Sequence, residues 1–185
     1  MVCGKNWEQI VRAYAQQYGI TKLRELIPAG NSGILSLKNA LNSISRLYDR
    51  EDLILIQEAT RPMVSAETIS SLLQACVNSN SATICHSMRD YVQFDTGCGT
   101  ARYLDRNNII ALQSPEAHRL SLLTALFQKA ERQQHPMTET NCTMLLYNLG
   151  FQINFIESSV NNIKISREED IAAFSAAVSA SAVYR

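Results

Sequence analysis

The chain has 185 residues, and its 17 lysine and arginine residues balance its 17 aspartate and glutamate residues. This balance argues against the broad basic surface that attracts nucleic acid or an anionic membrane, so we expect neither as a partner. Five scattered cysteines without Cys-x-x-Cys spacing argue against a disulfide scaffold and a structural zinc site. The length fits one domain over residues 1–185, and no apolar run is long enough for a membrane span or a signal peptide, which predicts a cytoplasmic protein.

The first part of the chain predicts two helices and a short strand. Apolar residues at helical spacing predict a helix over residues 6–18, with Gly19 at its end. A short strand over residues 22–28 leads into the loop Ala29–Gly33, which contains two glycines and two small polar residues. Such a loop lets backbone N–H groups approach a ligand, although a flexible turn is the commoner interpretation. The amphipathic run over residues 34–41 predicts the next helix.

Four consecutive aliphatic residues, Leu53–Ile56, predict a strand buried on both faces, as in the interior of a parallel sheet. The chain then becomes polar, with Glu58 and Arg61, before a capped helix over residues 66–78 and a strand over residues 82–85. This strand–helix–strand unit predicts a parallel sheet with a right-handed crossover. Open α/β sheets bind ligands at the carboxyl ends of their strands, so this loop is a candidate site, and an ordinary solvated loop is the alternative.

A β-hairpin is predicted next, because residues 89–95 and 100–104 alternate in polarity around a glycine-rich turn. An isolated two-stranded ribbon is marginally stable in water. We therefore expect the arm, residues 87–112, to pack against a partner, commonly an identical subunit.

The remaining elements complete the predicted α/β fold, a mostly parallel sheet with helices on both faces and one protruding arm. Ser114-Pro115-Glu116 predicts a helix start, because proline is favoured at the first helical position. A helix is predicted over residues 138–149 and a strand over residues 152–156. Ser166 and Glu169 have the spacing of a capping box that opens a final, alanine-rich helix.

Five motifs follow one another in order over residues 7–170. They are the loop at Ala29-Gly30 with Ser36 and Asn39-Ala40-Leu41, then Gln57–Pro62, then Asp105–Asn107 with Gln113–Glu116, then Glu139–Asn141, and finally Asn161–Ser166. Each motif alone is weak evidence. Together they resemble the motifs of the cytidylyltransferases that activate polyol phosphates, the family typified by 2-C-methyl-D-erythritol 4-phosphate and ribitol-5-phosphate cytidylyltransferases.

The resemblance implies a Rossmann-like fold and an activity. The activity is transfer of CMP from CTP to 2-C-methyl-D-erythritol 4-phosphate or ribitol 5-phosphate, with release of pyrophosphate. Such chemistry depends on positioning and on cationic stabilisation of the phosphates. The resemblance also implies Mg²⁺ or another divalent cation held by Glu58, a role in isoprenoid biosynthesis, and a homodimer formed through the arm.

Individual roles carry over only where a position matches a motif of the family. The residues implied to line the cytidine pocket are Ala29, Gly30, Ser36 and Ala59, with Arg61 ordering the site. The residues implied to hold the phosphate of the acceptor are Arg106, Thr140 and Lys164. Arg106 and Lys164 are the implied catalytic residues, with Arg106 offered across the dimer by the arm. The alternatives are that Lys164 is a solvated cation and that Thr140 is inert.

The chain also departs from the pattern of the family. We expect the first strand of the family fold and the glycine-rich loop that binds the CTP triphosphate to be missing. This expectation leaves open a truncated, catalytically inactive homologue that acts as a phosphate-binding or dimerisation module. A smaller departure is Gly33, which stands where the family commonly has arginine.

Overall fold

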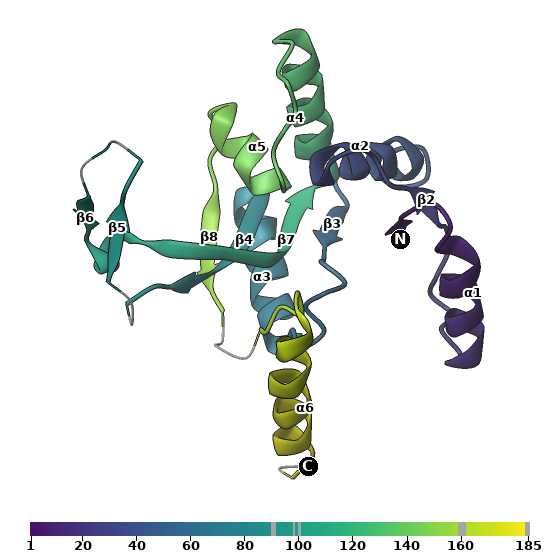
Figure 1. Cartoon of the computed structure of the whole chain (residues 1–185). Helices are drawn as coiled ribbons and strands as arrows, with labels where there is room; N and C mark the ends of the chain where they lie inside the picture. The colour runs from purple at the N-terminus through teal and green to yellow at the C-terminus, as the bar shows by residue number, and fades with distance from the viewer. Residues whose placement is uncertain (90–91, 98, 100, 159–161, 184–185) are drawn as a thin grey trace. The chain divides into compact units, whose positions relative to one another are not determined.

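The computed structural model describes residues 1–89, 92–97, 99, 101–158 and 162–183, with the backbone alone for residues 181–183 (Figure 1). The chain divides into two compact units. Unit 1 consists of Met1–Asp52 and Arg119–Ile153, and unit 2 consists of Leu53–His118 and Asn154–Arg185. Within the described ranges, no helix combines the length and the apolar character needed to cross a membrane.

Unit 1 is mainly helical. Its elements are β1 (Val2–Cys3), α1 (Glu8–Gln17), β2 (Ile27–Pro28), α2 (Gly33–Ile44), α4 (Leu120–Arg132) and α5 (Cys142–Asn148). The short strands β1 and β2 pair in parallel, and α2 packs against α4. The buried side chains of this unit are mostly leucine and isoleucine, among them Ile34, Leu41, Leu123, Leu126 and Leu145.

The local signals in unit 1 agree with the predicted helices. The helix predicted over residues 6–18 is α1, and Gly19 follows it with a positive φ of 61°. Ser32 caps α2, because its Oγ atom accepts a hydrogen bond from the backbone N–H of Leu35 at 3.2 Å. The helix predicted over residues 138–149 is shorter than expected, because Asn141 is the N-cap and its Oδ1 atom accepts from the N–H of Met144 at 2.9 Å.

Unit 2 is built on a four-stranded sheet. Its elements are β3 (Leu53–Ile56), α3 (Ala66–Ser79), β4 (Ser81–Ser87), β5 (Gln93–Asp95), β6 (Arg102–Leu104), the 3₁₀-helix η1 (Arg106–Asn108), β7 (Ile110–Arg119), β8 (Asn154–Glu157) and α6 (Glu168–Val183). The strand order is β3-β7-β4-β8, with β4 parallel to β8 and antiparallel to β7. Side chains from α3, including Leu72 and Cys76, pack against Ala82, Ile84 and Ala117 of the sheet.

The interior position predicted for Leu53–Ile56 is wrong. The segment is a strand, but β3 lies at one end of the four-stranded order, and Leu55 is 38% exposed. The reason is β7, which lies between β3 and β4 and takes the interior position of the sheet. A run of aliphatic residues shows that a strand is apolar, but it does not give the neighbours of that strand.

The helix start predicted at Ser114-Pro115-Glu116 is also wrong, because these residues belong to β7 and α4 begins at Leu120. The register explains how a proline fits in a paired strand. Thr83 pairs with Glu116 and Cys85 pairs with Leu112, so three residues of β7 lie opposite the single residue Ile84. This irregularity is a β-bulge, where proline interrupts no regular ladder and where side chains are re-aimed.

The final helix, α6, has a different cap from the predicted capping box. The Oδ2 atom of Asp170, in place of Glu169, accepts hydrogen bonds from the backbone N–H groups of Ser166 at 2.7 Å and Arg167 at 2.8 Å. These backbone donors lower the pKa of Asp170. Glu169 instead pairs with the guanidinium group of Arg167 at 3.3 Å.

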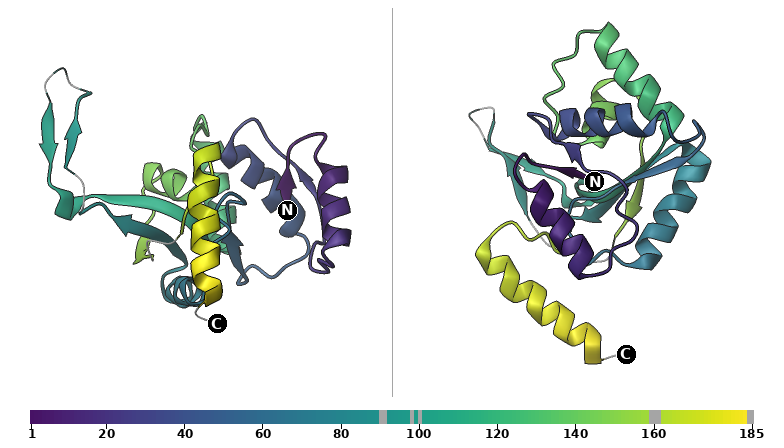
Figure 2. Two further views of the ribbon diagram at one scale, coloured as in Figure 1. Left: turned by 60° about the horizontal axis from the view of Figure 1, so that its bottom comes forward. Right: turned by 90° about the vertical axis from the view of Figure 1, so that its right-hand side faces the viewer.

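The predicted hairpin is present. Strands β5 and β6 pair antiparallel, and Figures 1 and 2 show them projecting from the ends of β4 and β7, away from the rest of the sheet. The rings of Phe94 and Tyr103 meet edge to face with their centroids 6.0 Å apart. Cys98 and Thr100, at the predicted turn, lie outside the described residues.

Candidate functional site

Glu58 is the centre of a charged cluster in the loop after β3. Its Oε2 atom accepts a hydrogen bond from Nε of Arg61 at 3.0 Å, and its Oε1 atom accepts from Nζ of Lys164 at 2.8 Å. Gln57 closes the loop, because its Nε2 atom donates to the backbone oxygen of Arg61 at 2.8 Å. The side chains of Glu58 and Lys164 are 44% and 42% exposed, so the cluster presents one carboxylate and an ammonium group to solvent.

The electrostatics of the cluster keep Glu58 ionised. Partial burial alone would raise its pKa, but the hydrogen bonds and charges of Lys164 and Arg61 outweigh burial, and the pKa of Glu58 lies below its ordinary value of 4.5. At neutral pH the loop therefore holds a fixed anion between two fixed cations, and it can take part in binding a charged ligand.

A polar network links this cluster to the bulge of β7. The Oε1 atom of Gln113 accepts hydrogen bonds from Oγ of Ser158 at 2.9 Å and from Nδ2 of Asn162 at 3.0 Å. Nδ2 of Asn162 also donates to the backbone oxygen of Ser114 at 2.8 Å. The Oγ atom of Ser114 in turn accepts from the backbone N–H of Glu58 at 3.0 Å. The bulge thus directs Ser114 toward the backbone of Glu58, and Gln113 toward Ser158 and Asn162.

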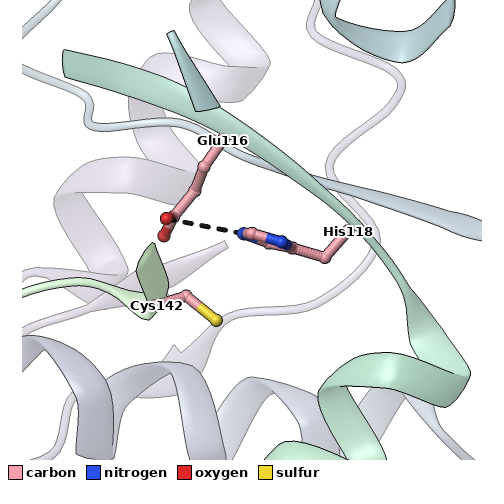
Figure 3. A group of neighbouring side chains, drawn as sticks. All are labelled: Glu116, His118 and Cys142. Carbon is pink, nitrogen blue, oxygen red and sulfur yellow. Dashed lines mark ion pairs between the residues drawn. The ribbon is translucent and has the colours of Figure 1, made fainter. Parts of the chain in front are cut away.

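A second pair of titratable side chains lies in the same sheet, on β7. Figure 3 shows Glu116 and His118 side by side, with Oε2 of the glutamate 3.4 Å from Nε2 of the histidine. The Nδ1 atom of His118 lies 2.9 Å from Oγ of Ser81, its partner on β4. The side chain of Glu116 is 6% exposed and that of His118 is fully buried, and the contact of His118 with Ser81 joins β7 to β4. Cys142, also labelled in Figure 3, belongs to unit 1.

Three of the four predicted cytidine residues belong to unit 1: Ala29 and Gly30 lie in the loop before α2, and Ser36 lies in the first turn of α2. The backbone N–H of Gly30 donates to Oγ of Ser36 at 3.0 Å, and this hydroxyl donates to the backbone oxygen of Ser32 at 2.8 Å. A Cβ atom on Gly30 would lie 2.7 Å from the backbone carbon of Leu35, which is too close for any side chain. Ala29 is exposed, and its N–H donates to the backbone oxygen of Cys3 at 3.0 Å. This segment is built from backbone geometry and the hydroxyl groups of Ser32 and Ser36.

Gly33 explains one departure from the pattern of the family. A Cβ atom at this position would lie 2.3 Å from the backbone oxygen of Thr140. The close approach of the two backbones excludes every side chain, including the arginine that the family commonly has here. It also places Thr140, one of the residues implied to hold the acceptor, against the first residue of α2.

The structure brings some of the predicted site residues together and leaves others apart. Glu58, Arg61 and Lys164 contact one another in unit 2, and Ala59 is exposed in the same loop. Arg106 is exposed in η1 and forms no hydrogen bond or ion pair with any residue that the structure describes. Gly30 and Ser36 contact one another in unit 1, which also contains Ala29 and Thr140.

Glu58 fits a divalent cation as one ligand among several. Mg²⁺ in nucleotide-dependent sites is commonly held by one or two carboxylates together with phosphate oxygens and water. An ionised carboxylate has about four lone-pair sites. Arg61 and Lys164 occupy only part of this capacity. Among the side chains that the structure describes, Glu58 belongs to no group of three or more histidine, cysteine or acidic ligands. The chemistry therefore fits a cation shared with a triphosphate and not a site made by protein ligands alone.

Sequence reasoning missed the supporting residues of this cluster. Gln113, Ser114 and Asn162 lie in two of the five motifs, but no role for them follows from the motifs alone. The available signal was a proline, Pro115, inside a segment of strand character, which is typical of a bulge. Ser158 carried no signal, because its hydrogen bond to Gln113 joins residues 45 positions apart.

Comparison with known proteins agrees with these motifs. The profile of the family described as 2-C-methyl-D-erythritol 4-phosphate cytidylyltransferase matches residues 9–180. The ribitol-5-phosphate cytidylyltransferase of Lacticaseibacillus paracasei is 25% identical over 178 residues, which cover 95% of this chain and 76% of that protein. The 2-C-methyl-D-erythritol 4-phosphate cytidylyltransferase of Halalkalibacterium halodurans is 27% identical over 157 residues, covering 85% of this chain and 66% of that protein.

Solved structures show the same fold. The 4-diphosphocytidyl-2C-methyl-D-erythritol synthase of Anaerococcus prevotii superposes with a TM-score of 0.78 at 18% identity, covering 96% of this chain and 77% of that one. The 2-C-methyl-D-erythritol 4-phosphate cytidylyltransferase of Francisella tularensis gives 0.73 at 22% identity, covering 84% and 73%. The predicted Rossmann-like α/β class is confirmed. With a family profile that matches nearly its whole length, the chain belongs to the 2-C-methyl-D-erythritol 4-phosphate cytidylyltransferase family.

Proposed function

We propose that this chain transfers a cytidylyl group from CTP to a polyol phosphate and releases pyrophosphate. The observation that carries the proposal is the contact of Glu58 with Arg61 and Lys164, which come from two motifs of the family about 100 residues apart in the chain. In the reaction, a phosphate oxygen of the acceptor forms a bond to the α-phosphorus of CTP. The bond from this phosphorus to the oxygen bridging to the β-phosphate breaks, and pyrophosphate leaves.

The proposed roles follow the chemistry of each side chain. Lys164 and Arg106 are cations that hold the phosphate of the acceptor and stabilise negative charge in the transition state, as positioned cations do in phosphoryl transfer. Thr140 offers a hydroxyl to the same phosphate. Ala29, Gly30, Ser36 and Ala59 accept the cytidine, and Arg61 orders the loop through Glu58.

Lys164 has a carboxylate partner in the structure, and a phosphate group competes for the same ammonium donor. Nζ of Lys164 lies 2.8 Å from Glu58, whose other oxygen keeps its hydrogen bond to Arg61. Glu58 is also the proposed ligand of a divalent cation, which neutralises charge on the triphosphate when it is bound. Titration calorimetry of Mg²⁺ in the presence of CTP reports this binding without turnover, and replacement of Glu58 by glutamine is expected to weaken it.

The acceptor is 2-C-methyl-D-erythritol 4-phosphate or ribitol 5-phosphate, because relatives with both names match the chain at similar identity. The first acceptor belongs to isoprenoid biosynthesis. The two acceptors differ by a few hydroxyl groups, and hydrogen bonds from the pocket to such groups are what separates substrates of this kind. The cytoplasmic location expected from the sequence stays a prediction.

A direct test incubates the purified chain with CTP, Mg²⁺ and each acceptor in turn. Pyrophosphate release is followed continuously, and the cytidine diphosphate polyol is identified by mass spectrometry. We expect product with one acceptor in clear preference to the other, and loss of turnover when EDTA removes the cation. No pyrophosphate release with either acceptor at millimolar concentrations would contradict the proposed function.

The arm supports a proposed homodimer. Val92, Phe94 and Tyr103 are 65%, 56% and 53% exposed, although a two-stranded ribbon with apolar side chains is poorly stable without a partner. Light scattering after gel filtration is expected to give twice the chain mass for the wild type and one chain mass for Phe94→Ser. The control is Phe155→Ser, which changes a 43% exposed phenylalanine of β8 and should leave the dimer intact. A monomeric wild type would contradict the dimer.

A further inference from the structure

Asn162 is a buried amide beside an exposed charged cluster. The residue is 4% exposed, whereas the side chain of Lys164, two positions later, is 42% exposed. Both Nδ2 hydrogens of Asn162 are used, on the backbone oxygen of Ser114 at 2.8 Å and on Oε1 of Gln113 at 3.0 Å. A backbone carbonyl can only accept a hydrogen bond, so the contact with Ser114 fixes which end of the amide points toward β7.

Packing alone does not explain an asparagine at this position. The Oδ1 atom of Asn162 is buried and has no hydrogen-bond partner in the described part of the chain. Burial of an amide group without full compensation is unfavourable, and an apolar side chain of similar shape would avoid the penalty. The amide is therefore suited to holding the position of its own backbone against the bulge of β7.

The segment around Asn162 binds one cation of the site through its backbone and includes the other, Lys164. Its carbonyl oxygen accepts a hydrogen bond from Nη1 of Arg61 at 2.8 Å. The N–H of Ile165 donates to the backbone oxygen of Thr60 at 2.8 Å, so the segment is joined to the Glu58 loop on both sides of Lys164. Without the side-chain anchor, Arg61 and Lys164 keep their charges but lose a fixed position relative to Glu58.

We infer that Asn162 is a positioning residue for the proposed transfer reaction. It clamps the Lys164 segment to the bulge of β7 and so sets the geometry of Arg61, Glu58 and Lys164. This inference rests on the proposed function, and it assigns Asn162 no contact with the substrate. Residues that orient the groups in contact with a substrate commonly change activity by about 10-fold to 100-fold when they are replaced.

The first test is a double-mutant cycle on kcat/KM for the preferred acceptor, with Asn162→Ala, Lys164→Ala and the double variant. We expect Asn162→Ala alone to lower kcat/KM by about 10-fold or more. Because Asn162 acts through the cations, Asn162→Ala should lower kcat/KM little further once Lys164 has been replaced. Losses that multiply fully in the double variant would overturn the positioning role. The control is Asn78→Ala, which removes an exposed amide from α3 and should leave kcat/KM unchanged.

A second readout needs no turnover, so it separates failure of this inference from failure of the proposed function. In ¹H–¹⁵N NMR spectra the Nε–H group of Arg61, hydrogen-bonded to Glu58, is expected to exchange slowly with solvent, and Arg61→Lys identifies its signal. Asn162→Ala should abolish the slowly exchanging signal. If that variant does not fold, Gln113→Ala removes one partner of the same amide and should also abolish it. A signal unchanged in the folded variant would overturn the inference, even for an active enzyme.

Discussion

The two segments proposed to hold ligand use different physical means. In unit 2, Glu58 and two cations place opposite charges in contact, and their side chains extend from two separate loops, that of Glu58 and Arg61 and that of Lys164. In unit 1, the loop before α2 and the first turn of α2 use closely packed backbone, the hydroxyl groups of Ser32 and Ser36, and two glycines that tolerate no Cβ atom. We therefore expect the Glu58 cluster to lose function when a charge is removed, and the loop before α2 to lose stability when side-chain volume is added.

Removal of one cation tests the Glu58 cluster and should give the largest loss of activity. Lys164→Ala is expected to lower kcat/KM by about 100-fold, the scale for loss of one donor that stabilises transition-state charge, with the free energy of unfolding almost unchanged. Lys38→Ala is the matched control, because Lys38 also pairs with a glutamate, Glu131, at 2.7 Å. Equal activity of the two variants would contradict the catalytic role of Lys164.

A methyl group added at Gly33 tests the close backbone packing at the start of α2. An alanine at the start of a helix such as α2 normally stabilises it relative to glycine. In Gly33→Ala, however, the new Cβ atom would lie 2.3 Å from the backbone oxygen of Thr140, so we expect a destabilisation of about 1–3 kcal/mol in urea unfolding. The control is Gly4→Ala, whose Cβ atom would have only an ordinary contact at 3.6 Å, with Trp7. Stabilisation in Gly33→Ala would contradict the close packing of this loop.

Loss of the Ser36 hydroxyl should also destabilise the loop before α2, by less than the added volume at Gly33. Ser36 accepts from the N–H of Gly30 and donates to the backbone oxygen of Ser32. Ser36→Ala leaves both groups without this partner and is expected to lower the free energy of unfolding by about 1 kcal/mol. The apparent affinity for CTP should fall in parallel, because the hydroxyl holds the loop that is proposed to accept cytidine. Unchanged stability and affinity would show that the hydroxyl does not hold this loop.

Acid should weaken the ion pairs of Glu58 and leave the hydrogen bonds of the loop before α2 unchanged. The folded-state pKa of Glu58 lies below its ordinary value of 4.5, so its ion pairs contribute stability above that value and lose it as the pH falls through the folded pKa. The stability difference between wild type and Glu58→Gln should be present at pH 7, begin to fall near pH 4.5 and vanish once the pH is below the folded-state pKa of Glu58. Because Glu58 is 44% exposed, we expect less than about 1 kcal/mol, reduced further by salt. A difference that grows in acid would contradict the sign of the shift.

The sequence predicted the parts of the fold and the site that depend on local signals. Helix α3 and its Ser65 cap depend on residues three positions apart, and the polar turn at Glu58 follows directly from an aliphatic strand. The contact of Glu58 with Lys164 joins residues 106 positions apart, and only the resemblance to the family placed both at one site. The bulge of β7 was missed because proline is typical of a helix start as well as of a bulge.

The order of the strands in the sheet could not be predicted from local sequence patterns either. The residues of β3 and β4 predict a parallel pair, but β7 inserts between these strands from a position more than 50 residues after β3. The hydrogen bonds of Gln113 and Asn162 depend on that insertion and on the bulge. The residues proposed to contact a ligand could therefore be named from the motifs, whereas the residues that support them could not.

Titration calorimetry of the purified chain with CTP and Mg²⁺ is the decisive experiment on the charged cluster of unit 2. We predict saturable binding by the wild type that requires the metal, loss of that binding in Glu58→Ala, and unchanged binding in Gly4→Ala. A wild type that shows no saturable heat at millimolar CTP, or a Glu58→Ala variant that binds as the wild type does, would contradict the claim that the charged cluster of unit 2 is part of a working cytidylyltransferase site.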